Sequence, residues 1–185
     1  MRKVAKFSKV SYEQFKADLI ACVDLDQIFM YSDCKDKEDM IREIYDNIKL
    51  PKRATKNSAG YDFFIPYDLV LDKLQGLETA LIPTGIRCQM EDNVVLMLYP
   101  RSGLGFKYRL QLDNTVGVID SDYFNAHNQG HIMAKITLDS RDKNELAFYP
   151  GDAFMQGIFT EYFITIDDDA DAVRTGGFGS TSIKK

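Results

Sequence analysis

Beyond residue 50 the chain is a succession of short apolar runs, and this pattern limits the possible folds more than any other feature. The runs cover residues 61–65, 81–86, 94–99, 116–119, 132–138, 154–159 and 162–166. Turn-forming residues separate them, as in Pro83-Thr-Gly85 and Pro150-Gly-Asp152. Many short strands joined by turns are typical of an all-β barrel or sandwich. We therefore expect an all-β, jelly-roll-like distorted β-barrel.

The first 50 residues have a different pattern. Residues 3–10 alternate imperfectly and predict an opening strand. Ser11 and Gln14 have the spacing of a capping box, and Asp36 precedes a second stretch with apolar residues at helical spacing, which Pro51 closes. We expect a small helical insertion at about 11–48, and we interpret it as a surface elaboration without catalytic duty.

Length and composition indicate one ordinary globular domain. The 185 residues, with 45% hydrophobic and 28% charged residues, predict a single domain over 1–185 with a flexible C-terminal arm at about 167–185. The net charge of −5 argues against nucleic acid as a partner. Cys22, Cys34 and Cys88 form no C-x-x-C pair and indicate reduced thiols. The sequence contains neither a signal peptide nor a membrane-length apolar run, so we expect a cytoplasmic protein without a membrane partner.

Residues 114–123 (NTVGVIDSDY) combine an apolar centre with polar ends. A hairpin here would present backbone groups and the Asn114 amide to the edge of a flat ring. Gly117 stands where its two arms would meet, a place for an unusual φ or a close approach to a ligand. Asp120 and Tyr123 would reach whatever the ring carries. The alternative is a surface hairpin with an Asp-Ser-Asp turn.

Two glycine-containing segments suit phosphate binding. Arg101-Ser102-Gly103 offers a cation, a hydroxyl and an exposed N–H at a strand end, although an ordinary turn has the same composition. Residues 174–181 provide an aromatic ring and hydroxyls that would close over a ligand, or else form a disordered tail. Ser102 lacks the context of a serine hydrolase. His127 and His131 have no third ligand nearby, so we expect no zinc site.

The order of these segments is specific. Residues 54–62, 100–105, 114–123, 151–156 and 174–181 resemble the five ordered motifs of the homotrimeric dUTP diphosphatases (dUTPases), and the resemblance covers roughly residues 49–181. The chain departs from the family pattern in three places. Ala153 stands where arginine is usual, Arg174 lies one residue closer to the Gly-Gly pair, and Phe124-Asn125 replaces a glycine.

The resemblance implies a role for each matched residue. Asp120 matches the aspartate that deprotonates the attacking water, and Tyr123 matches the ring under the deoxyribose. Asp62 matches an aspartate near the metal, reached through water, or near the subunit contacts. The residues matched to substrate binding are Arg101, Ser102, Gly103, Asn114, Gly117, Val118, Tyr123, Gln156, Arg174, Phe178, Gly179, Ser180 and Thr181.

The resemblance also implies the reaction. It predicts Mg²⁺-assisted hydrolysis of dUTP to dUMP and pyrophosphate, which keeps uracil out of DNA and supplies dUMP for thymidylate synthesis. It predicts a homotrimer with shared active sites, each closed by another subunit's arm. Two alternatives remain. One is a dCTP deaminase, which would need a glutamate after the third motif, and the other is a catalytically idle nucleotide-binding or partner-binding module.

Overall fold

The computed structural model describes residues 2–28, 36–174 and 176. Its helices are α1 (Tyr12–Cys22), α2 (Leu25–Ile28), α3 (Lys37–Asn47) and α4 (Ser102–Tyr108), with short 3-10 helices η1 (Lys73–Gln75) and η2 (Ser121–Asn125). Its strands are β1 (Ala5–Lys9), β2 (Lys52–Arg53), β3 (Tyr61–Phe64), β4 (Leu69–Asp72), β5 (Thr79–Met90), β6 (Val94–Pro100), β7 (Leu110–Leu112), β8 (Gly117–Ile119), β9 (Ile132–Leu138), β10 (Glu145–Phe148) and β11 (Ala153–Glu161).

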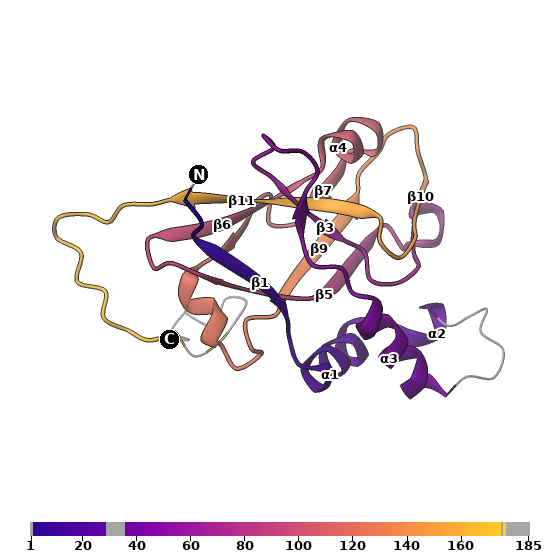
Figure 1. The fold of residues 1–185 in the computed structure, drawn as a ribbon. Coiled ribbons are helices and arrows are strands. Elements are labelled where there is room, and N and C mark those ends of the chain that lie inside the picture. Colours follow the sequence, from indigo (N-terminus) through magenta and orange to yellow (C-terminus); the bar gives the residue numbers. More distant parts are fainter. Residues whose placement is uncertain (1, 29–35, 175, 177–185) are drawn as a thin grey trace, which may run out of the picture.

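The strands form antiparallel sheets, so the predicted all-β, jelly-roll-like class is confirmed (Figure 1). One sheet has the order β1-β5-β9-β7, a second has β2-β3-β11-β6-β8, and β10 pairs with β4. The pairing of β5 with β9 shifts register between Pro83 and Ile86. Gly85 lies in this bulge with a φ of +73°, a conformation that glycine adopts without steric cost.

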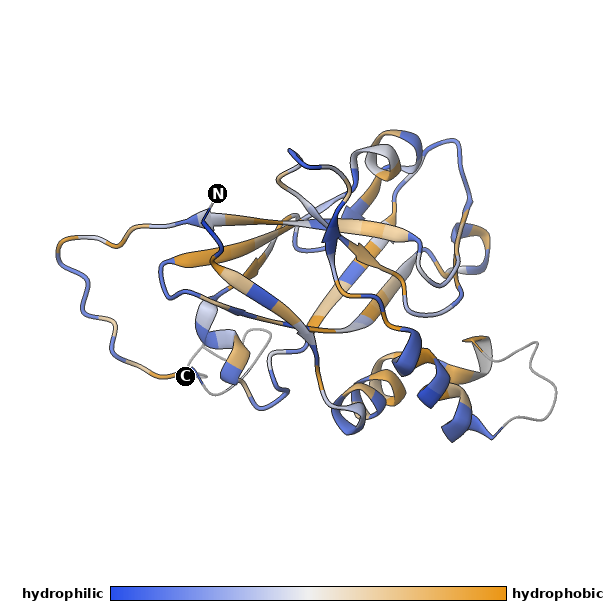
Figure 2. Cartoon of the chain, in the orientation of Figure 1, coloured by the Kyte–Doolittle hydropathy of each residue, from blue (hydrophilic) through white to orange (hydrophobic). Residues whose placement is uncertain are grey.

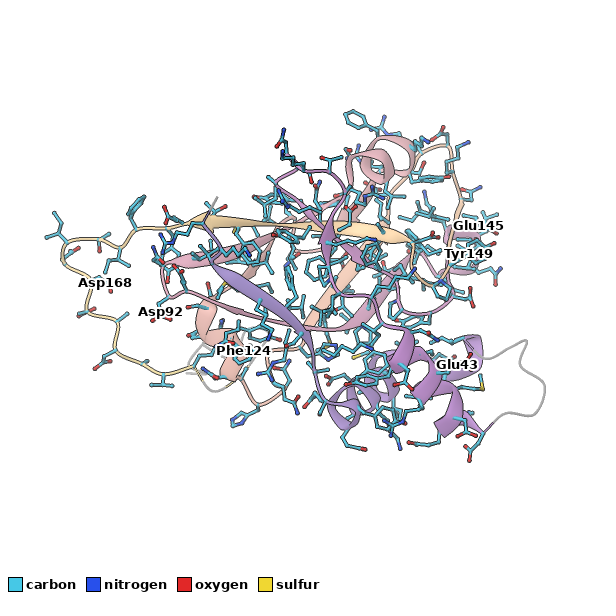
Figure 3. All side chains as sticks on the ribbon, viewed as in Figure 1. Glu43, Asp92, Phe124, Glu145, Tyr149 and Asp168 are labelled. Atoms are coloured by element: carbon cyan, nitrogen blue, oxygen red, sulfur yellow. The ribbon has the colours of Figure 1, made fainter. Side chains whose placement is uncertain are left out.

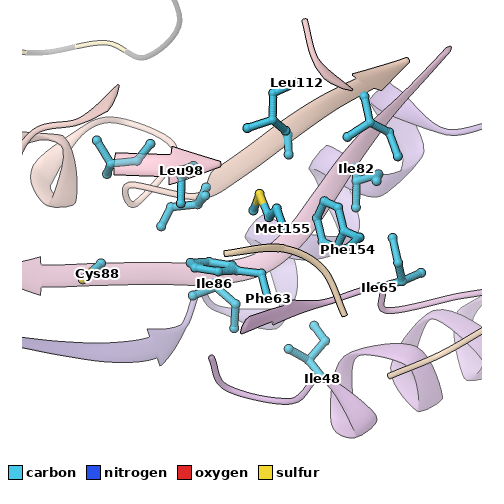
Figure 4. Packing of buried hydrophobic residues seen from close by; sticks show 14 of the residues in the cluster. Ile48, Phe63, Ile65, Ile82, Ile86, Cys88, Leu98, Leu112, Phe154 and Met155 are labelled. Atoms are coloured by element: carbon cyan, nitrogen blue, oxygen red, sulfur yellow. The ribbon is translucent and has the colours of Figure 1, made fainter. Parts of the chain in front are cut away.

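The core lies between the two larger sheets. In β9 every second residue is buried, as expected for a strand with one face on the core. Figure 4 shows Phe63, Phe154 and Met155 packed together near Ile82 and Ile86, and all five side chains are almost completely buried. Colouring by hydropathy shows the same division, with hydrophobic residues along the strands and hydrophilic residues in most loops (Figure 2).

The helical insertion is part of this core, which corrects the expectation of a surface elaboration. Phe15 and Leu19 of α1 are 0% exposed and Ile41 of α3 is 1% exposed, and all three belong to the same buried cluster as the strands. Both predicted N-caps are present: Ser11 Oγ accepts from the Gln14 N–H at 3.2 Å, and Asp36 Oδ1 accepts from the Glu38 N–H at 3.0 Å. The second half of the predicted capping box is not formed, because the Gln14 side chain donates to Asp18 and the Ser11 N–H donates to Gln129.

Two local predictions are wrong. Residues 162–166 form no strand; Phe163 is 92% exposed and Ile166 fully exposed, on a segment that bows away from the body towards Asp168 (Figure 3). The segment after Arg101 continues as helix α4 rather than as a simple turn, because Leu104 and Gly105 donate their N–H groups to the Arg101 carbonyl. The sequence pattern also missed the short strands β2, β4, β7 and β10.

Candidate active site

The segment 114–123 does not form the expected hairpin. The strand within these residues is β8, which pairs with β6, and η2 begins at Ser121, so no two arms meet at Gly117. The positive φ falls on Thr115 (65°), not on Gly117. Gly117 lies opposite Leu98, and a Cβ there would stand 3.0 Å from Leu98 Cβ. The glycine is therefore required by close packing between two strands.

Asp120 lies directly after β8 and precedes η2. Its side chain is 47% exposed, which leaves it accessible to a ligand. One guanidinium nitrogen of Arg174 donates to Asp120 Oδ2 at 2.9 Å and to Asp122 Oδ1 at 3.1 Å. The C-terminal arm therefore brings a cation of the fifth motif onto the carboxylate of the third motif within one chain.

Tyr123 is held rigidly beside this carboxylate. It is 5% exposed, its hydroxyl donates to the His131 carbonyl at 2.7 Å, and the Asn128 amide donates to that hydroxyl at 2.8 Å. Burial raises the pKa of Tyr123, so the phenol stays protonated and keeps donating. The Arg174 guanidinium lies 5.5 Å from the ring centre.

A second group of matched residues gathers at the other end of β6. Asp62 of β3 lies opposite Gln156 of β11, and Asp62 Oδ1 lies 3.2 Å from Arg101 Nε. The Gln156 amide donates to the Pro100 carbonyl at 3.3 Å. Next to Arg101 is a hollow of about 560 Å³, and its lining includes Ser102, Gly103, Lys107, Asp152 and Ala153.

The group around Asp120 and the group around Arg101 lie far apart in space within one subunit. Ile119 pairs with Leu96, so Asp120 stands level with the start of β6, whereas Arg101 follows its last residue, Pro100. A strand rises about 3.3 Å per residue, which separates Asp120 from Arg101 by about 20 Å along β6. Asp120 and Arg101 therefore lie at opposite ends of β6 within one chain.

The other matched residues are placed as follows. Asn114 and Val118 are exposed. Phe178, Gly179, Ser180 and Thr181, like Cys34, lie outside the described residues. The sequence reasoning missed Asp122 and Lys107, and it considered His131 only as a metal ligand. The one available signal was the position of Asn128 and His131, in the loop directly after the third motif.

Within the described part of the chain, His, Cys, Asp and Glu side chains make no group of three or more suited to holding a metal ion. No helix over the same residues is long and apolar enough to cross a membrane. Of the described cysteines, Cys22 and Cys88 are free thiols.

Comparisons with known proteins identify the family. A sequence model of the dUTPase family matches residues 46–182. The deoxyuridine 5'-triphosphate nucleotidohydrolase of Lactococcus lactis is 39% identical over 137 residues, which cover 72% of this chain and 88% of the relative. The corresponding protein of Escherichia coli is 38% identical over 136 residues, covering 70% and 85%. The chain therefore belongs to the dUTPase family of hydrolases, the dUTP diphosphatases.

Solved structures agree. The dUTPase of Streptococcus mutans has a TM-score of 0.56 at 35% identity, covering 65% of this chain and 90% of that one. A dUTPase of the S. aureus phage phi11 has a TM-score of 0.54 at 22% identity, covering 68% of this chain and 92% of that one. At this identity, the likeness supports the fold and nothing more. The family match begins at residue 46, so α1, α2 and most of α3 precede it.

Proposed function

We propose that this chain hydrolyses dUTP to dUMP and pyrophosphate by attack of a water molecule on the α-phosphorus, with Asp120 as the general base. The water oxygen bonds to phosphorus, the bond from phosphorus to the leaving pyrophosphate oxygen breaks, and the water proton passes to Asp120. In the cell this reaction would keep uracil out of DNA and supply dUMP for thymidylate synthesis.

The observation that carries the proposal is the separation of Asp120 from Arg101 at opposite ends of β6. Each group lacks what the other offers. One has a half-exposed carboxylate beside a buried tyrosine, and the other has an arginine, a serine hydroxyl and a glutamine. A complete site forms when the Asp120 end of one subunit meets the Arg101 end of another, as in a homotrimer with shared active sites.

Exposed apolar side chains in the arm and just before it support the same assembly. Phe163, Ile164 and Val173 are 92%, 70% and 86% exposed, and Ile166 is fully exposed. Such a run is unfavourable in water, and a neighbouring subunit would cover it. The arm would then carry Phe178, Gly179, Ser180 and Thr181 over the nucleotide, with Phe178 on uracil and the hydroxyls on phosphate oxygens.

The nucleoside part of the substrate would bind at the Asp120 end. The segment from Asn114 to Gly117 and Val118 would present backbone groups and an amide to the uracil edge. The Tyr123 ring would pack against the deoxyribose and leave no room for a 2′-hydroxyl. Its tight hydrogen bonding suits this role, because a fixed ring excludes a hydroxyl better than a mobile one.

A magnesium ion would be held mainly by the substrate. Mg²⁺ keeps several waters and commonly takes one or two carboxylates together with substrate phosphates, so a cage of three protein carboxylates is not required. Asp62, with a side chain 17% exposed and paired to Arg101, fits an indirect contact through water. When bound, the ion would neutralise charge on the phosphates. The phi11 phage dUTPase structure is described as coordinating a structural Mg(II) ion.

The experiment is a pyrophosphate-release assay over all the deoxynucleoside triphosphates and UTP, with Asp120→Asn as the test variant. We expect dUTP to be the preferred substrate, and kcat to fall on the order of 10²–10⁴-fold in the variant while nucleotide binding persists. Release of ammonia from dCTP would instead favour a deaminase. Absence of turnover with every nucleotide would favour a binding module.

A further inference from the structure

A buried hydrogen-bonded pair joins the N-terminal helix α1 to the loop that follows Tyr123. The imidazole of His131 is 0% exposed, and its Nδ1 lies 2.5 Å from Asp18 Oδ2. Its Nε2 accepts from the Gly85 N–H at 2.7 Å, in the bulge of β5. Because Nε2 accepts, Nδ1 carries the proton and donates it to Asp18. The ring is therefore fixed from both sides.

Hydrogen bonds also fix the Asp18 side chain and favour its charged form, which accepts the proton of His131 Nδ1–H in a hydrogen bond. The Gln14 side chain donates to Asp18 Oδ2 at 2.8 Å, and the Asp18 side chain is 17% exposed. Burial, the largest single influence, raises the pKa of Asp18, but the hydrogen bonds from His131 and Gln14 outweigh it, so the net pKa is lowered. A carboxylate placed this way favours one tautomer and one orientation of the histidine.

A second contact fastens the same loop to the start of α1. The Ser11 N–H donates to Gln129 Oε1 at 2.9 Å, and Gln129 Nε2 donates to Ser11 Oγ at 2.9 Å. The loop is thus attached to the insertion through both Gln129 and His131. The insertion precedes the family match at residue 46, so the support it gives the loop comes from outside the matched region.

The loop passes this restraint to Tyr123. The His131 carbonyl accepts the Tyr123 hydroxyl, and Asn128 donates to it. Gly130, between them, packs so closely that an added Cβ would lie 2.7 Å from the Tyr123 carbonyl oxygen and from Phe124 Cα. The guanidinium carbon of Arg87 lies 3.6 Å from the Phe124 ring centre, and a guanidinium nitrogen donates to the Phe124 carbonyl (Phe124 is labelled in Figure 3).

We propose that Asp18 and His131 are positioning residues for Tyr123, so that the helical insertion helps to set the sugar preference of the site. Neither touches the nucleotide. Asp18 orients His131, and the His131 carbonyl fixes the tyrosine hydroxyl and with it the plane of the ring. The proposal rests on the proposed function in one respect, the packing of Tyr123 against the deoxyribose.

The test uses the full-length chain and three variants of α1. Asp18→Ala removes the acceptor, Asp18→Asn keeps an oxygen for His131, and Glu13→Ala removes an exposed carboxylate from the same helix as a control. Two quantities are measured for each. One is the ratio of kcat/KM for dUTP to that for UTP, and the other is amide hydrogen exchange in peptides that cover residues 121–131.

We expect Asp18→Ala to accelerate exchange in this loop and to lower the dUTP/UTP ratio on the order of tenfold. Asp18→Asn and Glu13→Ala should stay near the unmodified protein in both. In a Tyr123→Ala background, Asp18→Ala should lower the ratio no further, because the two residues act as one unit. This set of results supports the proposal.

The contrary outcomes are distinguishable. Unchanged exchange in Asp18→Ala overturns the positioning network whatever the substrate is. Faster exchange with an unchanged dUTP/UTP ratio, while Tyr123→Ala lowers the ratio, overturns the specificity role of Asp18. Should Tyr123→Ala itself leave the ratio unchanged, the sugar assignment fails, and the specificity role fails with it. If Asp18→Ala does not fold, the double variant Ser11→Ala with Gln129→Ala removes the second contact between the loop and α1, and the same two quantities are measured for it.

Discussion

Arg174 Nη1 lies 2.9 Å from Asp120 Oδ2 of the same chain. The Arg174 side chain is 19% exposed although its neighbour Val173 is 86% exposed, so the arm returns to the body at this residue. Its Nε is buried and has no hydrogen-bond partner among the described residues. A triphosphate carries more negative charge than the two carboxylates, and we expect the guanidinium to move onto it when substrate binds.

Replacing Arg174 should therefore weaken substrate binding more than chemistry. In Arg174→Gln we expect KM for dUTP to rise on the order of tenfold with kcat changed much less, because a hydrogen bond to a charged group is worth about 1.5–3 kcal/mol. Arg141→Gln makes the same charge change at an exposed loop position and is the control. An unchanged KM in Arg174→Gln would mean that Arg174 does not bind the substrate and only contacts Asp120 in the ligand-free protein.

The insertion should be essential to stability. Phe15→Ala removes a fully buried ring of α1, and we expect it to lower the free energy of unfolding by about 3–5 kcal/mol. Ile20→Ala on the same helix truncates a side chain that is 51% exposed and should cost far less. Urea unfolding followed by circular dichroism, at one fixed protein concentration, measures both. Equal small effects would restore the view of the insertion as a surface elaboration.

Two glycines with the same backbone conformation allow the cost of backbone strain to be measured separately from the cost of a steric clash. Gly130 and Gly76 have φ values of +70° and +71°, but an added Cβ meets backbone at 2.7 Å only at Gly130 and meets nothing within 4 Å at Gly76. Gly76→Ala should cost about 1–2 kcal/mol of unfolding free energy, from the left-handed conformation alone. Gly130→Ala should cost clearly more and also lower kcat/KM for dUTP, because it displaces Tyr123. Equal costs in thermal unfolding would contradict the close packing.

The sequence predicted the general fold because short apolar runs and turn residues act locally. Both helix caps were likewise predictable, since Ser11 and Asp36 bond to residues two or three positions away. Residues 162–166 were mistaken for a strand because their apolar content is visible in the sequence, whereas the absence of a pairing strand is not. Residues 114–123 were predicted to form a hairpin for the same reason: the sequence does not reveal that β8 pairs with β6 rather than with a neighbouring arm.

The candidate site was predictable as residue types but not as an arrangement. The motif order indicated Asp120, Arg101 and Gln156, yet nothing local indicates that β6 holds Asp120 and Arg101 at opposite ends. The support of Tyr123 by Asp18 depends on the contact of Asp18 with His131, which is 113 positions further along the chain, and on the β5 bulge. Contacts of this separation follow from the tertiary fold alone.

The separation of Asp120 from Arg101 gives a quantitative test of shared sites. Asp120→Asn and Arg101→Gln should each abolish most activity when refolded alone. If each site takes Asp120 from one subunit and Arg101 from the next, refolding an equal mixture produces sites in which both residues are intact. Random assortment in a cyclic trimer makes about one quarter of the sites complete, so activity should return to about one quarter of that of the unmodified protein. Native mass spectrometry of differently tagged chains confirms that mixed trimers form. If they form and activity stays at the sum of the two single variants, Asp120 and Arg101 serve the same subunit's site, and the β6 separation must close by a conformational change instead.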